Sequence, residues 1–246
     1  MRLDWLTARP IAHRGLHDGA VAIENTASAF RAAIEGGFGI ETDVQITADG
    51  EAVVHHDFAL GRLTLGSRQL AAMTAAGLKE VPFKATSDRM MTLDELCDLV
   101  AGRVPLLIEL KSRFDGDLRL VKRAAEVMKA YGGPAALMSF DPAPIAALRE
   151  IAGSVPRGIV AERHYEDSEW YDLRPAQKRS LAFLLHGLRT RPHFVAYRVK
   201  NLPSPGPFIA RYLFGRPLLT WTVRTEQDRA TANRWADQMI FEGFRP

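Results

Sequence analysis

Residues that can carry acid–base, phosphate or metal chemistry recur in four short stretches of this 246-residue sequence. The stretches are HRG at 13–15, GIETDVQIT at 39–47, HHD at 55–57 and IELK at 108–111. In the second stretch, alternation with a period of two predicts a strand that carries Glu41 and Asp43 on one face. An exposed edge strand carries two carboxylates at little cost, whereas a buried central strand needs positive charge between them.

A third carboxylate, Glu109, shares a strand face with Lys111 further along the chain. If the fold brings Glu109 beside Glu41 and Asp43, the three carboxylates repel one another strongly unless a cation separates them. A ligand set made entirely of oxygen favours a hard divalent ion, Mg²⁺ or Ca²⁺, over zinc. We therefore predict a metal site at these three carboxylates, with the choice between the two ions left open.

Two histidines and two cations accompany the carboxylates. His13 and His56 suit proton transfer near neutral pH, because the charge of an imidazole changes in that range. Arg14 and Lys111 suit an anionic substrate. A metal ion, a pair of proton-transfer groups and two cations together indicate phosphoryl chemistry on an ester. His55 alternates with His56, so it is expected to point away from the site and to serve the structure.

Each of these residues also has a purely structural interpretation. Glu41 and Asp43 by themselves fit a solvated strand face. Glu109 and Lys111 fit an ion pair on one strand, and His13 fits a buried imidazole bonded to a backbone carbonyl. The functional interpretation rests on coincidence, because independent structural causes would have to place acids, bases and cations at the same ends of three successive strands.

The elements that must position these residues alternate regularly along the chain. We expect strands at 10–15, 39–47, 104–110, 135–140, 157–162, 194–199, 217–223 and 238–243. Expected helices occupy 24–37, 92–102, 116–133, 141–153, 174–191, 205–215 and 225–236. This order predicts an α/β fold, a TIM-type (β/α)8 barrel made of one domain over residues 1–246, with catalytic residues at the C-terminal ends of its strands.

Two local features refine this arrangement. Residues 58–91 have weaker periodicity and are expected to form a small insertion after the second strand. Just before them, residues 51–57 are expected to pair with 45–47 as a hairpin through the turn Ala48-Asp49-Gly50. Helix starts are predicted at Thr92 and at Asp141-Pro142. Asn25 is expected to be the N-cap of the first long helix, with a role in steadying the first loop near the metal as the alternative.

Composition narrows the class of protein. The 32 Lys and Arg residues exceed the 29 Asp and Glu residues only slightly. An excess this small and dispersed argues against a nucleic-acid partner and fits an anionic small molecule or a lipid surface. The single cysteine, Cys97, excludes an internal disulfide and is expected at an apolar helix position.

No apolar run has the length of a signal peptide or a membrane span, so we expect a cytoplasmic protein. Two basic and apolar segments, 174–194 and 205–217, are candidates for membrane contact. The position of the first segment in the strand–helix order assigns it instead to the fifth barrel helix.

Residues 13–15 and 23–57 resemble the signature of the glycerophosphodiester phosphodiesterase family. The similarity continues in order through RMMTLDELC, IELK, SFDP and LLTWTV, and so covers nearly the whole chain. The resemblance implies a β/α barrel with a divalent ion that hydrolyses glycerophosphodiesters to glycerol 3-phosphate and an alcohol. It also implies a set of site residues, namely metal ligands Glu41, Asp43 and Glu109, an acid–base pair His13 and His56, and phosphate-binding Arg14 and Lys111.

The sequence departs from the family pattern in two places. Ile23 stands where the family often has proline, and only 51 residues separate Asp57 from Glu109. This insertion is shorter than the family implies, so we expect a reduced cap over the site, with an effect on substrate choice. Ser139 and Trp221 end the fourth and seventh strands and are additional candidates for substrate contact, Trp221 as an apolar wall. The alternative for Ser139 is a structural role as a cap for the helix that follows.

Two alternative functions remain open at this stage. A lysophospholipase D-type activity would use the same site on a substrate that keeps one acyl chain, and an apolar groove beside Trp221 would favour it. A barrel that binds phosphodiesters without turnover should have lost a histidine or a metal carboxylate. All of them are present in this sequence, which argues against the binding protein.

Overall fold

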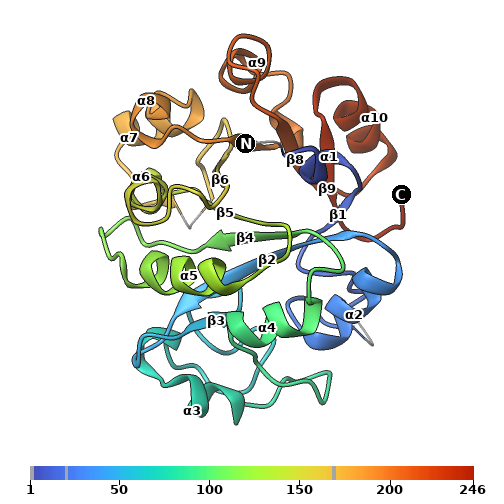
Figure 1. Ribbon diagram of the computed structural model, residues 1–246, viewed down its shortest axis with the longest axis vertical. Coiled ribbons are helices and arrows are strands. Elements are labelled where there is room, and N and C mark those ends of the chain that lie inside the picture. Colours follow the sequence, from blue (N-terminus) through green and yellow to red (C-terminus); the bar gives the residue numbers. More distant parts are fainter. Residues whose placement is uncertain (1–2, 20–21, 168–169) are drawn as a thin grey trace.

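The computed structural model describes residues 3–19, 22–167 and 170–246. Its central feature is a closed barrel of eight parallel strands with helices on the outside (Figure 1). The barrel closes at β1 (Ile11–Ala12), which pairs in parallel with β2 (Gly39–Ile46) on one side and with β9 (Gln238–Phe241) on the other. The predicted TIM-type barrel is therefore confirmed.

The other barrel strands follow chain order around the ring. They are β4 (Leu106–Leu110), β5 (Ala135–Ser139), β6 (Arg157–Ala161), β7 (Phe194–Arg198) and β8 (Leu218–Val223). Each predicted barrel strand is present in a shorter form. A further strand, β3 (Ala52–Val54), lies antiparallel to β2 with Val54 opposite Val44, so the predicted hairpin is also confirmed.

Helices follow the strands and surround the barrel. The longer ones are α2 (Ala27–Glu35), α4 (Leu93–Val100), α5 (Arg119–Ala130), α6 (Pro142–Ile151), α9 (Pro205–Tyr212) and α10 (Glu226–Trp235). Two predicted starts are confirmed by their caps. Thr92 and Glu95 form a reciprocal capping box, and the Asp141 carboxylate accepts a hydrogen bond from the backbone N–H of Ala143.

The predicted continuous helix over 174–191 is wrong, because the segment forms two helices. These are α7 (Pro175–Ala182) and α8 (Gly187–Thr190), and between them Leu184 adopts a positive φ of 56°. The Tyr197 hydroxyl of β7 donates to the carbonyl of Ala182 at 2.9 Å. The carbonyls of a last helical turn have no partner within the helix, and this contact from a distant strand satisfies the one at the end of α7, where the left-handed Leu184 turns the chain out of the helix.

Two apolar layers hold the barrel together. Inside it, side chains from the strands pack with Leu6 of α1 (Asp4–Thr7), and this cluster includes Leu107, Phe194, Leu219 and Ile240. Outside it, the strands pack against the helices in a larger cluster that includes Phe30, Ile40, Leu96 and Cys97. Because both faces of the strands are buried, the charged side chains on them need an electrostatic explanation.

Residues 58–91 follow β3 and form short elements, η1 (Leu70–Ala72) and α3 (Ala75–Lys79). Isolated bridges join Ala59 to Gln69 and Thr64 to Phe83. The segment packs around its own apolar cluster, which includes Leu60, Leu70, Leu78 and Phe83. In Figure 1, α3 lies at the edge of the molecule beyond β3 and α4.

The interior layer predicts a sharp size limit at Gly158 of β6. A methyl group there would lie 2.2 Å from the ring of Phe194, which is fully buried. We expect Gly158→Ala to lower the free energy of unfolding in urea by about 1–3 kcal/mol. The matched control is Gly187→Ala in α8, where an added methyl meets nothing within 4 Å. Equal stability of the two variants would contradict this packing.

Candidate active site

A cavity of about 390 Å³ opens at the C-terminal ends of the strands. Its wall combines residues of β2, β4, β5, β6, β7, β8 and β9 with residues of the loops that follow the barrel strands. Seven of the nine site residues predicted from the sequence line this cavity. They are His13, Arg14, Glu41, His56, Glu109, Lys111 and Trp221. This is the end of the barrel at which catalytic groups are expected.

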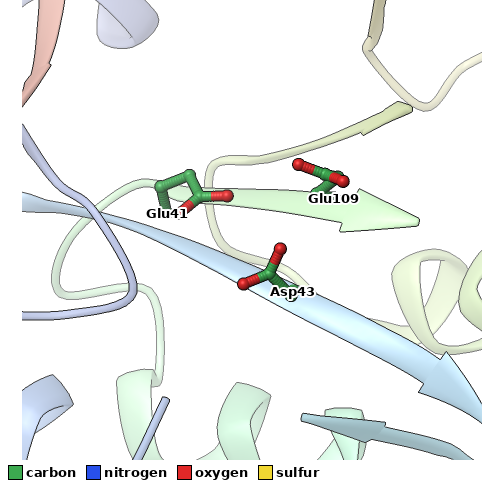
Figure 2. A group of neighbouring side chains, drawn as sticks. All are labelled: Glu41, Asp43 and Glu109. Carbon is green, nitrogen blue, oxygen red and sulfur yellow. The ribbon is translucent and has the colours of Figure 1, made fainter. Parts of the chain in front are cut away.

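Three carboxylates converge beside this cavity (Figure 2). Glu41 and Asp43 project from β2 and Glu109 from the neighbouring β4, where Asp43 and Glu109 are direct register partners. One oxygen from each carboxylate lies within 4.8 Å of the other two, and all three side chains are buried. The two strands therefore bring together the three residues that the sequence predicts as metal ligands.

The electrostatics of this carboxylate triad call for added positive charge. Burial raises the pKa of Glu41, and repulsion from Asp43 and Glu109 raises it further. Burial also raises the pKa of Glu109. Burial alone would raise the pKa of Asp43 too, but Lys111 and Arg14 outweigh it and hold that pKa well below its ordinary value. Three clustered oxygen donors with this charge deficit fit a hard divalent cation.

The two predicted phosphate-binding cations border the triad. The Lys111 ammonium lies 2.9 Å from Glu109 and 3.4 Å from Asp43. The Arg14 guanidinium lies 3.2 Å from Asp43 through Nε and 2.7 Å from Glu24 through Nη1. Both side chains also line the cavity, so they are placed to meet an anion as well as the carboxylates.

His56 belongs to a chain of charges that the sequence did not predict. Its Nδ1 lies 2.8 Å from Asp57, and Arg62 bonds both Asp57 and Glu24. Burial alone would raise the pKa of Asp57, but its bonds to His56 and Arg62 lower it. An ionised Asp57 accepts the proton of Nδ1, which leaves Nε2 of His56 for chemistry in the cavity.

His13 has a similar partner from the far end of the chain. Its Nδ1 lies 2.6 Å from the carboxylate of Glu242, which directly follows β9, while its Nε2 is 3.9 Å from Glu41. Burial lowers the pKa of His13 to about 4, more than the bond to Glu242 raises it. The imidazole is therefore neutral at pH 7, with Nδ1 held and Nε2 toward the triad.

Asn25 is not the helix N-cap that we predicted, since α2 begins after Thr26. Its side-chain amide donates to Asp43 at 3.0 Å, and its carbonyl oxygen accepts from the Thr42 hydroxyl at 2.7 Å. The residue is buried and has a positive φ of 59°. Asn25 therefore holds a carboxylate of the triad in place, which agrees with the side chain's tolerance for the left-handed conformation.

The two additional candidates have different positions. Trp221 lines the cavity and packs against Phe140, whose ring in turn contacts Trp170 at 4.8 Å, so an aromatic wall forms on this side. Ser139 is not among the cavity-lining residues. Its buried hydroxyl donates to the carbonyl of Leu110 at 2.7 Å and accepts from the N–H of Asp141.

Further charged residues at the site were missed. Glu162, Arg198 and Glu242 each stand at or just after the end of a barrel strand. Glu162 and Arg198 line the cavity and pair with each other, whereas Glu242 reaches the site through its bond to His13. Burial raises the pKa of Glu162. Their place at strand ends was a signal that could have identified them, because that rule had already selected His13 and Glu109.

Comparison with known proteins gives a consistent picture. The glycerophosphoryl diester phosphodiesterase family matches residues 13–244. A glycerophosphodiester phosphodiesterase of Caldanaerobacter subterraneus subsp. tengcongensis is 39% identical over 110 residues, which are 42% of this chain and 44% of the relative. A probable glycerophosphodiester phosphodiesterase 1 of Mycobacterium tuberculosis is 29% identical over 176 residues, 62% of this chain and 64% of the relative. The matched parts span less than two thirds of these relatives.

Solved structures share the fold over nearly the whole chain. A phosphodiesterase of Oleispira antarctica, in complex with the product sn-glycerol-3-phosphate, has a TM-score of 0.77 at 20% identity, covering 96% of this chain and 94% of its own. A glycerophosphodiester phosphodiesterase of Thermotoga maritima has a TM-score of 0.71 at 25% identity, covering 94% of this chain and 92% of its own.

The carboxylate triad predicts a measurable metal site. We expect the protein to bind one divalent ion in calorimetry, and Glu41→Gln or Glu109→Gln to weaken that binding at least about tenfold, since each removes a charged ligand. Bound metal should also raise the melting temperature of the wild type. Glu162→Gln is the control, because this carboxylate borders the same cavity but pairs with Arg198. If only Glu162→Gln weakened ion binding, the metal site would not be the carboxylate triad.

Proposed function

Because the chain belongs to the glycerophosphoryl diester phosphodiesterase family, we propose that it hydrolyses glycerophosphodiesters to glycerol 3-phosphate and an alcohol. The observation that carries the proposal is the convergence of one carboxylate triad, two histidines and two cations on a single cavity. The bound product of the Oleispira antarctica structure supports the same class of small-molecule substrate.

Glu41, Asp43 and Glu109 would hold one divalent ion, Mg²⁺ or Ca²⁺, because hard cations prefer all-oxygen sites. When bound, the ion supplies positive charge that stabilises the charge developing on the phosphoryl oxygens. Arg14 and Lys111 line the cavity beside the triad and would bind the phosphate, Arg14 through its planar guanidinium. Binding and orientation of the phosphodiester thus fall to residues of β1, β2 and β4 and the loop after β1.

His13 and His56 would form the acid–base pair. Each has its Nδ1 bonded to a carboxylate, Glu242 or Asp57, and each lines the cavity. The Nε2 atoms are thereby left for proton transfer. One histidine would accept the proton of the attacking oxygen as its bond to phosphorus forms. The other would protonate the alkoxide as the old ester bond breaks.

The aromatic wall around Trp221 would contact the carbon skeleton of the substrate. The sequence left two roles open for Ser139, substrate contact and a cap for the helix that follows. We now propose that it supports the end of β5 instead, because both bonds of its hydroxyl are made to the backbone of neighbouring segments.

The proposed chemistry predicts a specific pattern of lost activity. We expect release of glycerol 3-phosphate from glycerophosphocholine and glycerophosphoethanolamine, with loss of activity on adding a chelator. His13→Ala and His56→Ala should each lower kcat by about 10²–10⁴-fold, since each removes a proton-transfer group. His164→Ala, an exposed histidine outside the cavity, is the control.

The same assay tests the alternative activity. Turnover of a lysophospholipid with no turnover of either soluble substrate would replace our proposal by a lysophospholipase D-type reaction. Full activity of both histidine variants would overturn the acid–base assignment, whichever substrate is used.

Glu242 predicts a positioning effect that can be separated from binding. Glu242→Gln keeps the shape of the side chain but removes the charge that holds Nδ1 of His13. We expect kcat to fall at least about tenfold with little change in KM, because the residue acts on the orientation of His13. Glu226→Gln on the exposed start of α10 should leave both constants unchanged. A rise in KM without a change in kcat would place Glu242 in direct contact with substrate.

A further inference from the structure

Large apolar side chains are exposed on one part of the barrel's outer surface. Among the described residues, eight of the ten exposed large apolar side chains lie between positions 183 and 214. Leu188 is 89% exposed, Leu213 73% and Phe214 62%. These residues belong to the turn between α7 and α8, to α8, and to α9 and the loop after it, which are neighbours in Figure 1. Such a concentration marks an interaction surface.

A second cavity, of about 500 Å³, lies between these elements. Its wall is mainly apolar and includes Leu184, Leu188, Ile209 and Phe214, together with the charged Arg191 and Arg216. Arg191 leads into β7 and Arg216 into β8. This cavity therefore lies toward the N-terminal ends of these strands, whereas the catalytic cavity opens at the C-terminal ends.

The charge of this region is strongly one-sided. Residues 173–225 contain ten Lys and Arg residues and no Asp or Glu, whereas the rest of the chain has 22 basic against 29 acidic residues. The basic excess is thus concentrated, and our expectation that it is dispersed was wrong. A basic surface with exposed apolar side chains is complementary to an anionic layer with an apolar interior.

Several of these cations have no carboxylate nearby. Over the described ranges 3–19, 22–167 and 170–246, no acidic group lies within ion-pair distance of Arg179, Arg189, Arg191 or Arg216. Burial lowers the pKa of Arg157 beside them, and repulsion from neighbouring guanidinium groups lowers it further. An anion bound at this surface would relieve that repulsion.

We propose that this surface docks on the face of an anionic phospholipid bilayer. We define the α7–α9 surface by its apolar residues Phe183, Leu185, Leu188, Ile209, Leu213 and Phe214 and its cations Arg179, Arg189, Arg191 and Arg216. The apolar tips enter the boundary between head groups and acyl chains, and the arginines bind lipid phosphates. The catalytic cavity, at the other ends of the strands, stays open to water-soluble substrates.

A second copy of this chain fits the surface less well than a bilayer. In a two-fold interface the same patch meets itself, so unpaired arginines would face unpaired arginines. Like charges in contact disfavour such an interface. No helix in the described part of the chain is long and apolar enough to cross a membrane. Contact at the lipid surface is therefore the mode that the charges and the exposed side chains favour.

Vesicle flotation tests the proposal with the full chain. Vesicles of phosphatidylcholine with about one third phosphatidylglycerol should bind the protein at least about tenfold more tightly than vesicles of phosphatidylcholine alone. The reason is that each basic residue close to an anionic surface increases the affinity about fivefold. Binding should weaken in about 0.5 M salt, which screens the charges. Arg191→Glu/Arg216→Glu and Leu213→Ser/Phe214→Ser should each lose most of the binding.

Matched controls separate docking from folding and from net charge. Arg31→Glu/Lys129→Glu changes the net charge equally on other helices, and Leu65→Ser removes an exposed apolar side chain elsewhere. These variants should bind vesicles as the wild type does, and every variant should keep its turnover of soluble glycerophosphodiester. Absence of vesicle binding by the wild type would overturn the proposal. So would equal losses in the controls, or a wild-type dimer that Leu213→Ser/Phe214→Ser converts to monomer.

Discussion

The constraint on which this structure depends is the burial of three carboxylates at the mouth of a barrel. Glu41, Asp43 and Glu109 lie on strands that are buried on both faces. Repulsion and loss of hydration would push such groups apart or neutralise them. Lys111 and Arg14 offset part of that cost by direct contact with Asp43. The remaining deficit is the reason why we propose a divalent cation at this site.

The barrel meets this constraint by fixing the position of each carboxylate and histidine through the strand register or a hydrogen bond. Asp43 and Glu109 are opposite one another on neighbouring strands, so their separation is set by the sheet itself. The histidines are each fixed by a carboxylate at Nδ1, one from the residue after His56 and one from the residue after β9. Groups supported in this way keep their orientation without the substrate, which lowers the reorganisation that chemistry requires.

The fold also separates two electrostatic environments. Acidic residues that pair with Lys or Arg cluster at the C-terminal ends of the strands. Residues 173–225, which include the α7–α9 surface, contain no Asp or Glu. A barrel allows this separation because its strands and loops face the cavity while its helices face outward. One end can therefore carry chemistry while the outer surface carries interactions of a different kind.

The sequence by itself determined the strand order, the barrel and the residues that meet at its mouth, because strand period and strand-end position are local patterns. Those residues are the three carboxylates, the two histidines and the two cations. Only the tertiary structure decided the partners of those residues. Glu242 reaches His13 across 229 positions of the chain. Tyr197 of β7 donates to the last carbonyl of α7, and Asn25, two residues before α2, donates to Asp43. Such contacts depend on which distant segments become neighbours when the barrel closes, and no local sequence pattern encodes that proximity.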